Sequence, residues 1–455
     1  MGGGARGGAS VLASRVFACS EQTQDGSRGR SPHHTRRGMI RLLISTSTFP
    51  LRTDDALPRF VYDLANALSP TCDVGVLAPD APGALRDEQM GEVHVNRFTY
   101  FRPRGWQALA YGHGMRDNMR ASPLAKLQVF PYLAAQVHAT RAIVKRRNIQ
   151  VVNSHWMIPQ GWSTALACTR SRPFRHVLSV HAGDVYMLDK LPFGRPLARF
   201  IVRKTHRIFS DGSHVRDHLD ALLGFESNAV VQPMGVHNDL FRQPQAPPPS
   251  ASRFPEGFLL FFGRFAEKKG IRYLLQALPK IRRQRSGIGL VLIGNGAEEH
   301  ALRKEAARLG IEEAVDFVGR KTHEEILPYL HGCRAVVVPS IIDSRGETDG
   351  MPTVVIEAMA AGARVVACAV NGIPDVVRDG ENGWLCRPKD PDDLAEKILI
   401  ALDDPPHSRI VDGALETAAA LDWTNVAARY YDAFEQLLDA PAPGVSGSRR
   451  DPPRP

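Results

Sequence analysis

The strongest constraint on the fold is an alternation of short β-branched runs with longer amphipathic stretches, which starts at Ile40 and occurs twice along the chain. This order is typical of parallel α/β units. A Pro-rich segment at residues 243–253 separates the two series, and its composition predicts a linker. A chain of 455 residues is also too long for one ordinary hydrophobic core. The sequence therefore predicts an α/β protein with two Rossmann-like doubly wound domains facing a central cleft.

The β-branched runs place the expected strands, and the amphipathic stretches place the expected helices. Strands are predicted at residues 40–45, 73–78, 149–153, 176–180, 207–209, 228–232, 257–262, 289–293, 315–318 and 334–339. Helices are predicted near residues 57–69, 123–147, 159–170, 196–205 and 213–223, and from about residues 270, 298, 323 and 352. In doubly wound sheets, ligands bind beyond the carboxyl ends of the strands. The polar residues and glycines at those ends are His155, residues 181–184, Asp211, residues 263–264, residues 294–296 and Ser340.

Composition divides the chain into folded and unfolded parts. We expect a disordered basic extension at 1–38, a first domain at 39–242, the linker at 243–253, a second domain at 254–423, a helix at 424–440 that packs back across the junction, and a disordered tail at 441–455. Most of the net charge of +9 lies in the two ends, which argues against nucleic-acid binding. The six cysteines form no CxxC pair or metal-ligand spacing, and no apolar run is long enough to cross a bilayer. A cytoplasmic protein with free thiols is predicted.

An acidic, Gly-bearing loop runs into Pro352, where we expect a helix that stops at Gly362. Asp349 and Glu357 are eight residues apart, about 12 Å along a continuous helix, so they can serve one ligand only if Asp349 lies in the loop. The helix N-terminus offers unpaired N–H groups to an anion. This stretch predicts a phosphate pocket flanked by hydroxyl-rich groups; an amphipathic helix after a solvated acidic loop is the alternative.

A basic loop follows the strand predicted at 257–262. Gly263 and Gly270 bound it, and Arg264 and Lys269 lie between them. These two cations can grip a diphosphate, Arg as a planar fork and Lys as a point charge.

Several ordered motifs resemble one known family, the retaining glycosyltransferases of the GT-B fold, also called glycosyl transferases group 1. The motifs lie at residues 233–236, 263–270, 317–320, 338–340, 349–357 and 371–383. The resemblance extends from about Met39 to about Asp439. It implies a hexosyltransferase that moves a sugar from a nucleoside-diphosphate sugar to a glycan, a lipid-linked glycan or a small molecule, as in polysaccharide biosynthesis.

The resemblance also implies roles for individual residues. Arg264 and Lys269, in the loop that starts at Gly263, would neutralise the donor diphosphate, so that no metal or other cofactor is required. The glutamate that binds the donor ribose corresponds to Glu357. The Gly350 and Met351 backbone would face the phosphate or the sugar, and Gly319 and Arg320 would hold the base. His181 would point from the acceptor-side N-terminal domain at the transferred sugar, while residues 254–423 would bind the nucleotide sugar.

The sequence departs from the family pattern at the first acidic position of the Glu-x7-Glu motif, where Asp349 stands. We include Asp349 with His181, Arg264 and Lys269 among the catalytic residues, without assigning it the role of a nucleophile. His237 stands where an Asp is usual, and the loop at residues 49–56 lacks the usual glycines. Two alternatives stay open: a non-catalytic nucleotide-sugar-binding subunit and a GT-B sugar-nucleotide epimerase.

A basic amphipathic stretch lies outside these motifs. Arg195, Arg199, Arg203, Lys204 and Arg207 are interleaved with Leu197, Phe200 and Ile201, and residues 145–147 are also basic. Such faces suit peripheral contact with an anionic membrane, here the inner face of the membrane, while a solvated face is the alternative.

Overall fold

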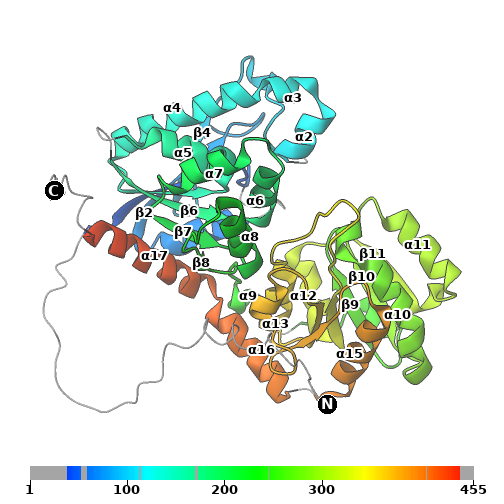
Figure 1. Cartoon of the computed structure of the whole chain (residues 1–455). Helices are drawn as coiled ribbons and strands as arrows, with labels where there is room; N and C mark the ends of the chain where they lie inside the picture. The colour runs from blue at the N-terminus through cyan, green and yellow to red at the C-terminus, as the bar shows by residue number, and fades with distance from the viewer. Residues whose placement is uncertain are drawn as a thin grey trace, which may run out of the picture. The chain divides into compact units, whose positions relative to one another are not determined.

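Two β-sheets, each flanked by helices, organise the protein in the computed structural model (Figure 1). The structure describes residues 38–52, 59–111, 114–169, 173–243, 245–405 and 407–440. The extension before residue 38, the tail at 441–455 and part of the 49–56 loop lie outside these residues. The predicted α/β class with two Rossmann-like sheets is confirmed.

The first sheet has the strand order β3-β4-β2-β1-β5-β6-β7-β8. Its strands are β1 (Ile40–Ser45), β2 (Cys72–Pro79), β3 (Asp87–Met90), β4 (Val93–Phe98), β5 (Val151–His155), β6 (Arg175–Val180), β7 (Arg207–Ser210) and β8 (Val230–Val231). All neighbours pair in parallel except β3 and β4. Because β5, β6 and β7 are parallel neighbours, their carboxyl ends lie side by side.

The second sheet has the strand order β11-β10-β9-β12-β13-β14, and every pairing in it is parallel. Its strands are β9 (Phe258–Phe262), β10 (Gly289–Ile293), β11 (Val315–Gly319), β12 (Ala335–Val338), β13 (Val365–Cys368) and β14 (Trp384–Cys386). The chain order reverses beside β9, where β10 and β12 pair on opposite sides. Such a reversal places a ligand crevice at the carboxyl ends of the strands.

Helices cover both sheets. Those around the first sheet are α1 (Phe60–Leu68), α2 (Met115–Ala121), α3 (Pro123–Leu127), α4 (Val129–Arg147), α5 (Trp162–Ala167), α6 (Ala182–Asp189), α7 (Gly194–Val202) and α8 (Ser213–Leu223). Those around the second are α10 (Ile271–Gln284), α11 (Glu299–Arg308), α12 (His323–Gly332), α13 (Thr353–Ala360), α14 (Ile373–Val376), α15 (Pro391–Asp403) and α16 (Arg409–Ala420); α17 (Trp423–Asp439) ends the described chain. The short helix α9 (Asn238–Phe241) packs against α13 and the core of the second sheet. None of these described helices is both long and apolar enough to cross a membrane.

Strand β9 shows why the sequence forms a central, doubly covered sheet. All five of its residues are buried, as expected for a strand with helices on both faces. Leu259 and Phe261 belong to the hydrophobic cluster that includes α10 and α15, whereas Leu260 and Phe262 belong to the cluster of α12, α13 and α16. Alternate side chains of one strand therefore serve the two cores.

Helix α17 returns to the first sheet after α16 has packed against the core of the second. Val236 donates its N–H to Leu421, and Trp423 donates its N–H to Val236, at 3.0 and 3.1 Å. Tyr430 and Phe434 then join the core of the first sheet. The short crossing at residues 421–423 is thereby tied to the strand β8 side of that sheet.

Four strands were not predicted: β3, β4, β13 and β14. Strand β4 was not predicted because polar residues interrupt its apolar pattern. These polar residues are buried: Arg97 lies in the core and binds Glu88 at 3.1 Å and Tyr111 at 2.8 Å. Local pattern cannot show that a charged side chain has such partners. The short runs of β13 and β14 are strands because each pairs with a neighbour.

Buried His176 predicts a specific pH dependence of stability. Burial lowers the pKa of His176 from 6.5 to about 3, so the native state does not take up the proton that the unfolded state binds below pH 6.5. The free energy of unfolding should fall as the pH is lowered through this window, by about 1.4 kcal/mol per pH unit for this histidine. Denaturant unfolding at several pH values should show that the free energy of unfolding depends less steeply on pH in His176→Gln than in the wild type. The exposed His300→Gln is the control. An equally steep dependence in His176→Gln and the wild type would show that His176 is not the source of this pH effect.

Candidate active site

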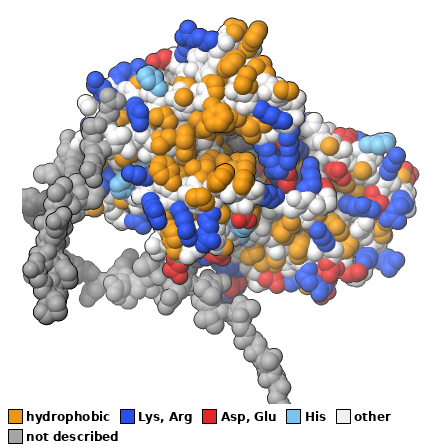
Figure 2. Space-filling view, turned by 45° about the horizontal axis from the view of Figure 1, so that its top comes forward, with side chains coloured by type: hydrophobic (Ala, Val, Ile, Leu, Met, Phe, Trp, Pro, Cys, Tyr) orange, Lys and Arg blue, Asp and Glu red, His pale blue; other side chains and the backbone are white. Residues whose placement is uncertain are grey.

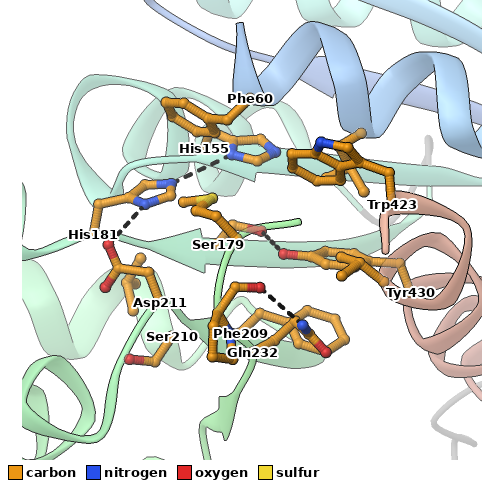
Figure 3. Close-up of a pocket in the computed structure, with 15 residues that line it drawn as sticks. Phe60, His155, Ser179, His181, Phe209, Ser210, Asp211, Gln232, Trp423 and Tyr430 are labelled. Atoms are coloured by element: carbon orange, nitrogen blue, oxygen red, sulfur yellow. Dashed lines mark hydrogen bonds and ion pairs between the residues drawn. The ribbon is translucent and has the colours of Figure 1, made fainter. Parts of the chain in front are cut away.

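Three neighbouring strands bring two histidines and one aspartate together. His155 ends β5, His181 follows β6 and Asp211 follows β7. His155 Nδ1 lies 3.3 Å from His181 Nε2, and His181 Nδ1 lies 3.2 Å from Asp211 Oδ2. The two imidazole rings stack, and Phe60 packs edge-on against His181 (Figure 3). The residues of this cluster are up to 56 positions apart in the chain, and the pairing of β5, β6 and β7 brings them into contact.

The backbone around His181 is fixed by Asp184. His181 is the N-cap of α6, and Asp184 accepts its N–H at 3.1 Å as well as the N–H of Met157. Burial raises the pKa of Asp184 to about 6. This carboxylate therefore joins the start of α6 to the loop after β5 and fixes the backbone of His181.

A buried polar chain connects the histidines to α17. His155 Nε2 lies 3.5 Å from the Asn153 amide, Ser179 donates to Asn153 at 3.1 Å, and Ser179 meets the Tyr430 hydroxyl at 3.0 Å. Figure 3 shows His155, Ser179 and Tyr430 beside Trp423, and these residues line a small cavity of about 10 Å³. Burial lowers the pKa of His155 well below its usual value, with a smaller contribution from His181, so His155 is neutral at pH 7.

The basic loop after β9 is held by close backbone crossings. The Phe265 N–H binds the Asn295 carbonyl at 2.8 Å, and a Cβ on Gly294 would overlap the Gly263 carbonyl. Gly270, at φ +66°, ends the 3₁₀ helix η5 (Glu267–Lys269), and a Cβ there would overlap the Pro339 carbonyl. The loop can therefore pack closely against the residues that follow β10 and β12 only because Gly294 and Gly270 lack side chains.

Lys268 and Lys269 both bind Asp349. Their ammonium groups lie 2.9 and 2.5 Å from the two carboxylate oxygens. Burial acts to raise the pKa of Asp349, but the two lysines outweigh it and lower that pKa below its usual value. Arg264 is exposed, and its guanidinium has no ion pair with another described residue. The basic loop thus carries two lysines paired with Asp349 and one arginine, Arg264, without an ion pair to a described residue.

A second set of contacts shapes the acidic loop before α13. The Asn371 amide donates to the Asp349 carbonyl at 2.7 Å and to the Thr348 hydroxyl at 2.6 Å. The Ser344 N–H and hydroxyl bind Glu267 of the basic loop at 2.9 and 2.8 Å. The two loops are therefore joined at both ends, by the lysine–aspartate pairs and by the Ser344–Glu267 bonds.

The helix after the acidic loop begins one residue later than predicted. Pro352 has ψ +121° and is the N-cap, so α13 starts at Thr353 rather than at Pro352. The left-handed φ of +68° at Gly362 agrees with the predicted stop. Met351 is buried, whereas Gly350 is half-buried at the N-terminal end of the helix.

Glu357 has a partner that the sequence did not reveal. Its carboxylate lies 3.8 Å from His323 Nε2 at the start of α12, and the neighbouring carboxylate raises the pKa of His323. Gly319 ends β11 with φ +83°, and its carbonyl accepts the Gly294 N–H at 2.9 Å. Arg320 follows and is exposed. Glu357, Gly319 and Arg320 therefore lie on or after elements that border the carboxyl ends of the second sheet.

Gly350 connects the two halves of the site. A Cβ on Gly350 would lie 3.0 Å from Asp211 Oδ2 and 3.5 Å from Ala182 Cβ, so the backbone before α13 lies against the Asp211 and His181 cluster. Ser213 donates its N–H to Asp375 at 2.7 Å in the same region. The structure thus brings the sequence-predicted His181 close to the predicted Gly350, and it adds Asp211 between them.

The role of Asp211 and His155 was not predicted, although both were among the strand-end residues. The signal that could have grouped them is topological: they follow neighbouring strands of one parallel sheet. Lys268 and His323 carried no such signal, because each contacts its carboxylate through a loop or helix end.

Comparison with known proteins identifies the family. Residues 57–240 match the family described as Glycosyltransferase Family 4, and residues 244–414 match Glycosyl transferases group 1. A D-inositol 3-phosphate glycosyltransferase of Frankia alni is 30% identical over 316 residues, which is 65% of this chain and 76% of the relative. The chain belongs to the glycosyl transferases group 1 family, so the predicted resemblance is confirmed.

Solved structures share the fold. Sucrose-phosphate synthase from Thermosynechococcus elongatus superposes with a TM-score of 0.67 at 20% identity, covering 88% of this chain and all of that one. HepE from Anabaena, solved in complex with UDP and glucose, superposes with a TM-score of 0.60 at 17% identity, covering 87% and 99% of the two chains. The fold is accordingly GT-B, as predicted.

Gly270 offers a test of how the basic loop is held. Gly270 and Gly310 share φ +66°, but only at Gly270 would a Cβ meet neighbouring backbone. Gly310→Ala should lower the free energy of unfolding by about 1–2 kcal/mol through backbone strain alone. Gly270→Ala should cost clearly more, because the loop must also move away from Pro339. Denaturant unfolding of both variants measures the difference, and equal losses would rule out the close packing described for this loop.

Proposed function

We propose that this enzyme is a metal-independent, retaining hexosyltransferase that uses a nucleoside-diphosphate sugar. The observation that carries the proposal is the cluster of Arg264, Lys268 and Lys269 in one loop, bound to the Asp349 loop at the N-terminal end of α13. Family membership and the UDP and glucose bound by the similar HepE structure support it.

The proposed diphosphate site combines fixed cations with a helix N-terminus. Departure of the sugar leaves negative charge on the diphosphate, and cations already in place stabilise that charge without reorganisation. Lys269 and Arg264 act on it directly, and the N–H groups at the start of α13 add a favourable dipole. This stabilisation is the contribution that a divalent ion makes in other phosphate-transfer sites.

Asp349 has a positioning role in this proposal. Its carboxylate holds the Lys268 and Lys269 ammonium groups beside the loop that leads into α13 before the donor binds. Because its pKa is lowered, Asp349 stays ionised at neutral pH. The Asp in place of the usual Glu is one methylene shorter, and the lysines meet it within 2.9 Å. We therefore assign Asp349 to cation positioning and not to nucleophilic attack.

Glu357 and the end of β11 complete the nucleotide site. We assign the ribose hydroxyls to Glu357, with His323 beside it as a further hydrogen-bonding group, and the base to the backbone of Gly319 and Arg320. Gly350 and Met351 then lie between the diphosphate and His181, which faces the transferred sugar.

The acceptor is proposed to be a glycan or lipid-linked glycan reached at an anionic membrane surface. On α7 and the turn after it, Arg195, Arg203 and Lys204 are exposed and border a surface hollow of about 410 Å³. Phe193, 77% exposed, precedes them. Figure 2 shows hydrophobic side chains gathered on this face with Lys and Arg side chains around them. Exposed aromatics beside cations suit an anionic interface.

Part of the predicted basic face is engaged within the protein. Arg199 donates twice to the Leu223 carbonyl, at 2.8 and 2.6 Å, Arg147 binds Asp73 at 2.6 Å, and Arg207 binds Gln436 at 3.2 Å. Ile201 is fully buried. The proposed membrane contact therefore depends on Arg195, Arg203 and Lys204.

Lys269→Ala tests the proposed transfer chemistry. Turnover of UDP-, GDP- and ADP-glucose by the purified wild type first establishes the donor. In Lys269→Ala we expect kcat to fall by about 100-fold or more, because a cation that acts on the leaving diphosphate is lost. The matched control is Lys397→Ala, which breaks the 2.7 Å Lys397–Asp379 pair between α15 and the turn before β14. Full activity in folded Lys269→Ala would refute the assigned role, and a wild type that only binds donors would identify a non-catalytic subunit.

The membrane proposal is tested by reversing charge on α7. The variant Arg195→Glu, Arg203→Glu, Lys204→Glu should lose cosedimentation with phosphatidylglycerol vesicles, whereas the wild type should bind them. The control Lys304→Glu, Lys389→Glu, Arg409→Glu changes the net charge equally at exposed positions elsewhere and should still bind. Equal binding by both variants would exclude α7 as the contact surface.

A further inference from the structure

Asp211 has a half-satisfied carboxylate in the proposed site. Its side chain is only 9% exposed, and one oxygen, Oδ2, binds His181 at 3.2 Å. The other oxygen, Oδ1, is fully buried and has no hydrogen-bond partner among the described residues. A buried polar atom without a partner destabilises the folded protein, and a charged one does so more strongly. A native position of this kind calls for a ligand that supplies the missing donor.

The contacts at this site form a continuous chain that ends on Asp211. With the Asp211 oxygen as acceptor, the chain is satisfied when His181 donates from Nδ1 and accepts at Nε2 from His155 Nδ1. His155 in turn accepts at Nε2 from the Asn153 amide. Every donor of this chain is directed toward Asp211 and none reaches its Oδ1. Oδ1 is therefore an acceptor that receives no hydrogen bond from the described residues.

The position of Asp211 indicates the group it accepts. Asp211 lies against Gly350, directly before α13, and against His181 at the start of α6. A sugar whose phosphate lies at the N-terminus of α13 would place its hydroxyls beside Gly350, and thus beside Asp211. A hydroxyl is a neutral donor that can reach a buried oxygen, unlike a phosphate, which a carboxylate repels.

We propose that Asp211 is a specificity-determining residue that accepts a hydrogen bond from one hydroxyl of the transferred sugar through Oδ1. The inference rests on the proposed function and assigns a residue outside the motifs of the family resemblance. Its anionic charge also favours the positive charge that develops on the sugar ring as the diphosphate departs. A site built to bind a hydroxyl discriminates strongly against an analogue that lacks it, because the buried acceptor is then left unpaired.

The test compares donors that lack one hydroxyl. Using UDP-glucose and its 2-, 3-, 4- and 6-deoxy forms, kcat/KM is measured for the wild type, Asp211→Ala and the control Asp189→Asn. Asp189, the last residue of α6, is the matched control because it also pairs with a histidine, His218 of α8, at 3.4 Å. Unlike Asp211, the Asp189 side chain is half exposed. In the wild type and the control, kcat/KM for one deoxy donor should be about tenfold or more below that for UDP-glucose. In Asp211→Ala, kcat/KM for that donor and for UDP-glucose should differ by less than about threefold, because the acceptor is absent.

The outcomes separate this inference from the proposed function. If the wild type is active but the loss of kcat/KM for every deoxy donor, relative to UDP-glucose, is the same in Asp211→Ala as in the wild type, the role of Asp211 is wrong. The proposed transfer activity is then unaffected. If the wild type transfers sugar from none of UDP-, GDP- or ADP-glucose, the proposed function is wrong, and the inference falls with it. Asp211→Asn, which keeps an oxygen acceptor of the same shape, serves where Asp211→Ala does not fold, and it should lose most of kcat/KM while retaining part of the selectivity.

Discussion

The ion pairs of Asp349 with Lys268 and Lys269 are the interaction on which the proposed site depends. They join the loop after β9 to the loop before α13, and thus two segments that are 80 residues apart. Ion pairs that are removed from water cost solvation energy, and geometry must compensate for it. Here the compensation is shared by two cations on one carboxylate and by the Asn371 bonds to the same loop.

A second constraint acts from the first sheet. His181 is held by the capping contact of Asp184, by Asp211 and by His155, and these groups come from three neighbouring strand ends. The chain of polar groups continues through Ser179 to Tyr430 of α17. The last helix therefore contributes to the support of a site residue that lies about 250 positions earlier in the chain.

The fold could be predicted from sequence to a large extent because its signals are local. β1 and β10 have the predicted limits, and α8 begins and ends where the amphipathic pattern does. Strand β4 could not be predicted, because Arg97 and Asn96 are buried by partners elsewhere in the chain. Pro352 was placed in the helix because a proline suits the first helical position, but its ψ of +121° makes it the N-cap residue before the helix.

The sequence by itself determined the family, the two-sheet α/β fold and the candidate residues Arg264, Lys269, Glu357, Gly350 and His181, because motifs and periodicity are properties of neighbouring residues. Only the tertiary structure decided which of them touch: that Asp349 binds the lysines, that Glu357 meets His323, and that Asp211 stands between His181 and Gly350. The physical reason is that hydrogen bonds and ion pairs act over about 3–4 Å. Contacts at that range depend on how strands and loops far apart in the chain are packed.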